Sequence, residues 1–320
     1  FSKADLTNAS IMDVDLTEAD FSDAILTNAN FTRSLMGSAN LSDATIEKTD
    51  FTACNLINAN FSGVELKNVN LEKAGLSRAI FNGTKFTDVN MVGADLSLTT
   101  FDDVDLSKTR LQKAQFAQST LDDMNFNGQD LTEVVFDKGS VSGSRFEKAK
   151  LNGASFFDTE VSKNFFKNAQ MLKADFDGAY IFKSIFDNAE LTKANFSSAN
   201  IESSAFTGAK MTGANFSGAV LTKVDFTNAD LTGMKINADT KMDNVIFDGA
   251  DLSNAKIEKF TAKRVFYNNK TKFPEGFNPR AFGFRKPGEK AVEVVVEKKK
   301  SSSVADDAMP QKKKRRKKKN

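Results

Sequence analysis

One apolar side chain recurs at every fifth residue of this chain. From Phe1 to Ile236, all 48 such positions hold Leu, Phe, Ile, Met or Val. An α-helix buries a side chain about every 3.6 residues and a β-strand every second one, so a spacing of five fits neither. Of the 47 positions two residues before these, from Ala4 to Met234, 24 hold Ala and most others are small. This internal repeat has to be explained before any other feature.

A square coil explains the spacing of five. If five residues form one side and four sides form one turn, each side points one large and one small residue inward and three residues outward. A 20-residue coil then stacks on the next at about 4.8 Å, so the repeat predicts a rod of roughly 60 Å with about 12 coils. Backbone groups pair between coils, as buried polar groups require. The expected fold is an all-β solenoid.

Large residues spaced by 20 fall on the same side of such a coil, and many of them are Phe. In the second half of the repeat, one side carries one Phe series and the opposite side carries another. These series are Phe126, Phe146, Phe166, Phe186, Phe206 and Phe226, and Phe116, Phe136, Phe156, Phe176, Phe196 and Phe216. We therefore expect two ladders of stacked rings in the core, with mainly aliphatic residues on the other two sides.

Stretches such as "ANLSDA", "ADFSDA", "ANFSSA" and "ADLTGM" resemble the pentapeptide repeat family, whose pattern is A(D/N)LXX. The resemblance covers roughly residues 1–260 and implies a right-handed quadrilateral β-helix of about 12–13 coils. The phrase "TKFPEGFNP" (271–279) is similar to the segment that closes many family members of cyanobacteria and plastids. It implies a plastid location, stromal or thylakoid-associated, or the cytoplasm of a cyanobacterium.

The chain divides into three expected parts. Residues 1–260 form the solenoid, residues 261–285 form a C-terminal cap over its open end, and residues 286–320 form a basic low-complexity tail that is disordered when free. Between Ile236 and Met242 the step is six residues, so we expect a bulge in 237–241. Between residues 124 and 164, the position two residues before each large residue often holds a residue other than Ala. We expect less regular turns there.

The residue inventory argues against catalysis. The chain has no His, which excludes Ser/His and Cys/His nucleophile pairs and imidazole ligands for a metal. Its one Cys, Cys54, occupies a small inward position and is expected to be a buried spacer. The acidic residues sit on outward positions in water. We therefore expect a protein that is not an enzyme and that uses no cofactor or metal.

Several large apolar residues occupy positions that the repeat assigns to solvent. An exposed aromatic cluster on a protein surface usually marks a contact surface, so we predict a partner-binding patch. Its residues are Phe157, Phe165, Leu172, Tyr180, Phe182 and Ile185. Four of them, Phe165, Tyr180, Phe182 and Ile185, should lie on two adjacent sides of neighbouring coils. The alternative is that the stretch 155–170 bulges and buries some of these side chains.

The net charge of +2 conceals a division of the chain. Residues 1–260 hold 25 basic and 36 acidic residues, whereas residues 261–320 hold 19 basic and 6 acidic residues. The basic clusters suit RNA phosphates, anionic membrane lipids or an acidic protein, and resemble a nuclear import signal. They comprise Lys298, Lys299, Lys300, Lys312, Lys313, Lys314, Arg315, Arg316, Lys317, Lys318 and Lys319. A solvated tail, or one that folds back on the acidic rod, is the alternative.

These features together favour a non-enzymatic scaffold. The rod would present its faces and the aromatic patch to protein partners, and the tail would attach it to an anionic surface within a larger assembly. The alternative is a DNA mimic that regulates a DNA-binding enzyme such as a topoisomerase, because some pentapeptide repeat proteins resemble duplex DNA in width and charge. An open end of the solenoid also offers a surface for a homodimer.

Overall fold

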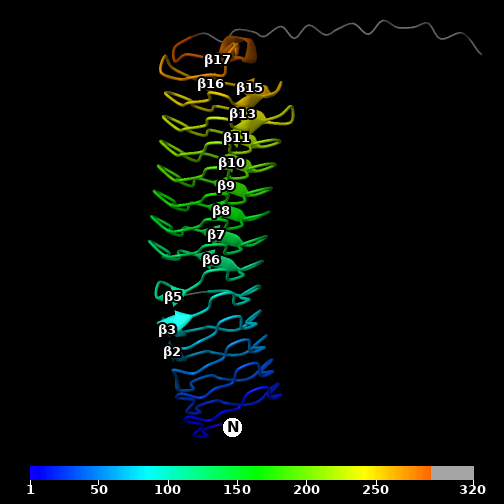
Figure 1. Ribbon diagram of the computed structural model, residues 1–320, viewed down its shortest axis with the longest axis vertical. Coiled ribbons are helices and arrows are strands. Elements are labelled where there is room, and N and C mark those ends of the chain that lie inside the picture. The colour runs from blue at the N-terminus through cyan, green and yellow to red at the C-terminus, as the bar shows by residue number, and fades with distance from the viewer. Residues whose placement is uncertain (102, 290–320) are drawn as a thin grey trace, which may run out of the picture.

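The computed structural model describes residues 1–101 and 103–289, and these form one long stack of coils (Figure 1). The residue numbers rise from the N-terminal coil at the lower end to the cap with β17 at the upper end. The fold is the expected right-handed quadrilateral β-helix of about 12 coils. The basic clusters of the tail, residues 298–300 and 312–319, lie outside the described residues.

Short parallel strands form ladders along the sides of the rod. The main sheet has eight strands, in the order β15-β13-β11-β10-β9-β8-β7-β6. They are β6 (Thr120–Asp122), β7 (Ser140–Ser142), β8 (Glu160–Ser162), β9 (Tyr180–Phe182), β10 (Asn200–Glu202), β11 (Val220–Thr222), β13 (Lys241–Asp243) and β15 (Thr261–Lys263).

The remaining strands form smaller parallel groups. One sheet contains β1 (Ile46–Glu47), β2 (Glu65–Lys67) and β3 (Lys85–Thr87), and three pairs join β4 (Val89–Asn90) to β5 (Thr109–Arg110), β12 (Lys235–Ile236) to β14 (Lys256–Ile257), and β16 (Val265–Phe266) to β17 (Phe284–Arg285). A 3-10 helix, η1 (Pro279–Phe282), lies just before β17. Elsewhere single bridges join each coil to the next, with an offset of 20 residues up to the bridge between Asn215 and Lys235 and of 20 or 21 residues after it.

The bulge expected in 237–241 is present. The register between coils changes there from 20 to 21 residues, because Leu221 pairs with Met242. The Asn237 side chain accepts a hydrogen bond from the Gly218 amide, and the Thr240 hydroxyl donates to the Phe216 carbonyl at 3.0 Å. The extra residue is therefore held by side chains that pair with the backbone of the preceding coil.

A second insertion of the same design occurs at residues 268–271, which the sequence analysis missed. Asn268 accepts from the Gly249 amide, and Thr271 donates to the Phe247 carbonyl. The coil pattern thus continues beyond residue 260 as far as Lys272, which bridges to Asp251. Phe284 then stacks on Phe247 at 5.9 Å, so the closing segment extends the aromatic core.

The core contains the two expected Phe ladders. Along each ladder the rings are nearly parallel, as for Phe166 and Phe186, whose centroids are 4.6 Å apart at an interplanar angle of 10°. Opposed ladders meet edge to face, as for Phe176 and Phe186 at 5.9 Å and 84°. Offset-stacked and edge-to-face contacts are the two arrangements that aromatic quadrupoles favour. All of these side chains are fully buried.

The Phe ladders occupy different sides in the two halves of the rod. In the first half, stacked rings follow the series of Phe61, Phe81 and Phe101 on one side and of Phe31 and Phe51 on the opposite side. From Phe116 onward the rings follow the other two sides. The three-stranded sheet and the main sheet change sides in the same way, so the core is rotated by one side of the square.

The coil at this change of sides is irregular. Within the described residues, Asp105 forms no bridge to either neighbouring coil. Two open surface hollows of about 500 Å³ each adjoin residues 98–101 and 103–105. One is lined by Phe101, Asp103, Val104, Asp105, Thr120, Asp122, Asp123, Met124 and Asn125, and the other by Arg78, Ala79, Ile80, Phe81, Asn82, Leu98 and Thr100. The first of these hollows lies between the last coil of the first half and the first coil of the second.

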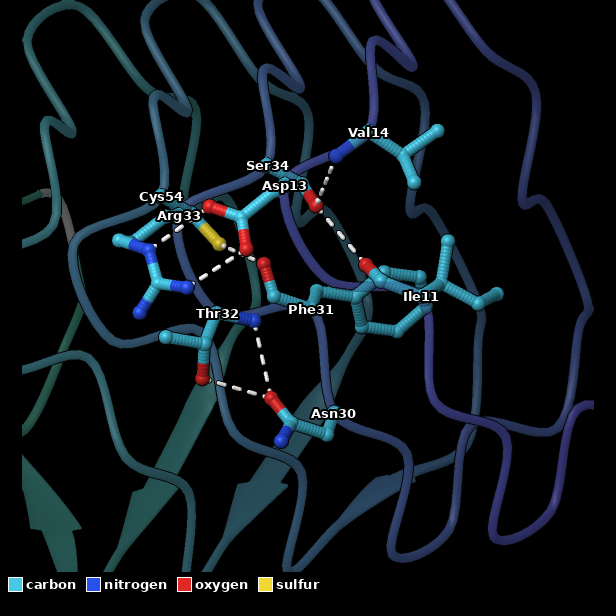
Figure 2. A network of polar contacts seen from close by, with 9 residues as sticks. All are labelled: Ile11, Asp13, Val14, Asn30, Phe31, Thr32, Arg33, Ser34 and Cys54. Atoms are coloured by element: carbon cyan, nitrogen blue, oxygen red, sulfur yellow. Dashed lines mark hydrogen bonds and ion pairs between the residues drawn. The ribbon is translucent and has the colours of Figure 1, made fainter.

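The turns between residues 124 and 164 are regular, so the expectation of less regular turns there was wrong. Strands β6, β7 and β8 pair with an unbroken 20-residue offset. Polar residues replace Ala at the small position because they bond to a carbonyl of the preceding coil. Figure 2 shows the same bond near the N-terminus, where Ser34 and Cys54 each donate at 2.8 Å to the carbonyls of Ile11 and Phe31, respectively.

Candidate partner-binding surface

Few features of the described residues suit catalysis. Cys54 is buried and donates to the Phe31 carbonyl, and burial raises the pKa of its thiol to about 12. Such a thiol is almost entirely protonated at neutral pH and is a poor nucleophile. Over residues 1–101 and 103–289, no group of three or more His, Cys, Asp or Glu residues is arranged to hold a metal ion. In that same part of the chain no helix is long and apolar enough to cross a membrane.

Four residues of the predicted patch lie together around one corner of the rod. Tyr180 and Phe182 belong to β9 and point outward on either side of the buried Ile181. Phe165 and Ile185 bridge to each other on the adjacent side, one coil apart. The exposed fractions are 39% for Phe165 and 38% for Tyr180, while Phe182 and Ile185 are half-buried. We name these four residues the aromatic corner.

The other two patch residues lie elsewhere. Leu172, 43% exposed, and Phe157, half-buried, occupy the two remaining sides of the square, and Phe157 lies at the turn that leads into β8. The six residues therefore occupy all four sides of the rod. The stretch 155–170 contains no bulge, because β8 keeps the regular offset with both β7 and β9.

The two rings on β9 form a small flat platform. The Tyr180 and Phe182 rings are 6.1 Å apart between centroids and almost parallel, at 11°. The Lys183 Nζ lies 4.8 Å from the centre of the Phe182 ring, a cation–π contact. Since β9 pairs with β8 and β10 on its two edges, the platform has no free strand edge and can contact a partner only through side chains.

A buried polar ladder supports the aromatic corner from inside. In an ordinary corner the amide of the small residue donates within its own coil, as Ala174 does to Met171. At this corner the amide of Ser144 donates instead to the Asn164 side chain at 2.8 Å, and the amide of Asn164 donates to the Ser184 hydroxyl at 3.2 Å. The amide of Ser184 continues the ladder by donating to the Ser204 hydroxyl.

This ladder explains why Ser144 and Asn164 replace Ala at positions where the repeat places a small residue. Ser144 and Asn164 looked like a loosened small position, but their side chains accept amide hydrogen bonds from the coil before. Asn164 also donates its side-chain amide to the Val141 carbonyl at 2.7 Å. Four polar residues spaced by 20 were the signal that could have revealed it.

Charges of both signs occur along another column of the rod. From coil to coil this column contains Asp130, Lys150, Gln170, Glu190, Lys210, Asp230, Asp251 and Lys272. Lys210 is 2.9 Å from Glu190 and Lys272 is 2.7 Å from Asp251. The hydrogen bond from Lys272, reinforced by Ser253, lowers the pKa of Asp251 to about 2. This column is a patchwork of cations and anions rather than a negative stripe.

The stacked square coils and the five-residue spacing define a β-solenoid repeat protein. The family model for the pentapeptide repeat region matches residues 4–76, 59–136, 159–236 and 179–257. These matches span more than half of the chain, so the chain belongs to the pentapeptide repeat family.

Solved structures of the same family are similar to it. HetL, a protein of the cyanobacterium Nostoc sp. strain PCC 7120 involved in heterocyst differentiation regulation, is 20% identical over 78% of this chain and 90% of its own, with a TM-score of 0.21. Full-length QnrB1, a plasmid-mediated fluoroquinolone resistance protein, is 18% identical over 82% of this chain and 94% of its own, with a TM-score of 0.25.

A pentapeptide repeat protein of the Arabidopsis thaliana thylakoid lumen is 30% identical over 36% of this chain and 66% of its own, with a TM-score of 0.14. No curated protein sequence matches the chain.

Proposed function

We propose that this protein is a non-enzymatic scaffold whose rod binds a protein partner through the aromatic corner. The observation that carries the proposal is the exposed aromatic platform of Tyr180 and Phe182, continued around the corner by Phe165 and Ile185. Aromatic residues are enriched at protein interfaces because they offer a large contact area at low entropic cost. The buried polar ladder beneath fixes the corner, so little ordering is needed on binding.

Comparing two aspartate variants tests this function. Phe182→Asp places a carboxylate on the platform, whereas Leu172→Asp places one on a different side, at a more exposed position. Both variants should give the far-UV circular dichroism of the wild-type protein. In pull-downs from an extract of the source cells, we expect Phe182→Asp to lose the partners that wild type and Leu172→Asp retain. Equal retention by all three proteins would refute the proposal.

The basic tail is the second element of the proposed scaffold. Its Lys and Arg clusters give it the charge needed to attach the rod to RNA, to an anionic membrane or to an acidic protein. Removal of residues 298–320 is expected to weaken binding to phosphatidylglycerol vesicles or to poly(U) RNA at low salt and to flatten the dependence on salt. Unchanged affinity and salt dependence for both probes would show that the tail is passive.

We further propose a plastid or cyanobacterial location, because the "TKFPEGFNP" segment is similar to the closing segment of family members from these sources. A fluorescent fusion can test this location.

A DNA mimic is the second candidate, favoured by the excess of acidic residues in residues 1–260. A mimic of duplex DNA needs regularly spaced negative charge along the rod. The column from Asp130 to Lys272 instead interleaves cations with anions. The scaffold is therefore the better-supported function.

A further inference from the structure

Two lysines stand one above the other at the aromatic corner. Lys163 and Lys183 both occupy the left-handed turn position, with φ of 58° and 49°, and both are exposed. Among the described residues neither has a carboxylate within ion-pair distance, and neither do Arg145 and Lys167 beside them. Two like charges on adjacent coils repel each other. Some adjacent coils place opposite charges together, as for Lys210 and Glu190. Lys173 and Lys193 form a second stacked pair of exposed lysines on another side of the rod, away from the two rings on β9.

We propose that the aromatic corner binds an acidic, apolar segment of a partner protein, whose carboxylates pair with Lys163 and Lys183. This inference rests on the proposed function and adds the chemistry of the partner. The lysines lie at the turn between the two sides of the corner, with Phe182 before Lys183 and Phe165 after Lys163. A segment laid across the corner places apolar side chains on the rings and an acidic side chain at the lysines between them.

The surrounding carboxylates favour a protein segment over a nucleic acid. Glu160 and Glu202 occupy the coils on either side of Tyr180 and Phe182, in the same strand columns. On the adjacent side, Glu147 and Asp187 stand one coil before and one coil after Lys167. A phosphodiester strand carries a charge at every nucleotide and would meet these acids as it leaves the corner. A short segment with one or two carboxylates fits between them.

The positions of the lysines provide variants that should fold. Asn tolerates the left-handed conformation better than most residues, so Lys163→Asn and Lys183→Asn remove charge without straining the turn. Lys193→Asn is the matched control, because Lys193 is exposed, has a φ of 60° and lies on another side of the rod. Each exposed ion pair contributes modestly, so we expect about a two- to fivefold loss of affinity for each lysine of the corner.

The probe is a phage-displayed library of random 12-residue peptides, selected on the full-length protein and depleted on Phe182→Asp. We expect the selected peptides to be enriched in Asp and Glu together with aromatic or aliphatic residues. Synthetic copies should bind the double variant Lys163→Asn/Lys183→Asn about 4- to 25-fold more weakly than wild type, while Lys193→Asn binds normally. Replacing Glu by Gln in the peptides should cause a similar loss.

Several results would overturn the inference: no enrichment of acidic residues, equal binding by the double variant, or tighter binding of the oligonucleotide dT12 at the same corner. The pull-down separates these failures from failure of the proposed function. If Phe182→Asp loses the cellular partners while the double variant keeps them, the corner binds a protein but not through acidic side chains. If neither variant loses them, the proposed function itself is wrong.

Discussion

Truncation of two buried Phe residues with the same place in the repeat should have unequal costs. Phe176 stacks on Phe156 at 4.7 Å and on Phe196 at 5.0 Å, and meets Phe186 edge to face. Phe101 also fills a large inward position and is only 3% exposed. It stacks on Phe81 at 5.9 Å, meets Phe116 edge to face at 5.6 Å, and lines an open hollow of about 500 Å³.

The expected magnitudes follow from these surroundings. Phe176→Ala leaves a new void between rigid coils and removes three ring contacts, so we expect a loss of about 4 kcal/mol in the free energy of unfolding. Phe101→Ala removes two ring contacts, and the adjoining hollow gives water access to the void that it leaves, so we expect a loss of about 2–3 kcal/mol. The difference should be at least about 1 kcal/mol.

Urea unfolding followed by far-UV circular dichroism measures both losses on the full chain. Phe176→Leu serves as a control that keeps most of the volume and should cost less than Phe176→Ala. If Phe101→Ala costs as much as Phe176→Ala, the change of Phe ladders between Phe101 and Phe116 does not weaken the packing there, and our account of that change is wrong.

Three further predictions concern single groups. Cys54 should resist thiol reagents at pH 8 in the folded protein and react after addition of urea, because its pKa is about 12; rapid labelling without urea would show that the coil opens. Asp251 has a folded pKa of about 2 against an ordinary value of 3.8, so its contribution to stability is present above pH 4 and lost as the pH falls towards 2. Lys272→Met should move the Asp251 pKa towards 3.8 in a carboxyl NMR titration, and an unmoved pKa would exclude Lys272 as the cause. Asn164→Ala should cost about 1–3 kcal/mol and Asn164→Ser much less, since Ser fills the same role in the polar ladder; equal urea midpoints would contradict this.

The fold was predictable because the five-residue spacing of apolar side chains can be read from the sequence without knowledge of contacts between coils. Each fifth residue must be apolar for a square coil to close on a dry core, and the chain satisfies this at every position from Phe1 to Ile236. The same register placed Tyr180 and Phe182 outward, on either side of Ile181. The bulge at 237–241 was also visible, because an insertion shifts every later residue of the repeat.

Features that depend on contacts between coils were not predictable in this way. The change of Phe ladders was not predictable, although Phe101, Val104 and Leu106 all follow the repeat. The repeat determines which positions are large and buried, but it does not determine which sides of the square carry the Phe rings. The side of the square on which each patch residue lies was predictable from the register, which placed only Phe165, Tyr180, Phe182 and Ile185 on adjacent sides. The stacking of the Tyr180 ring on the Phe182 ring was not predictable, because it depends on side-chain contacts.

The most direct test of the central claim places a photo-crosslinking amino acid on the rod. With p-benzoylphenylalanine at position 182, irradiation in native extract should yield a crosslinked protein partner. The same group at position 172, on another side of the square, should yield none. Crosslinks of equal yield at both positions, or at position 172 alone, would contradict the claim that the aromatic corner is the partner-binding surface.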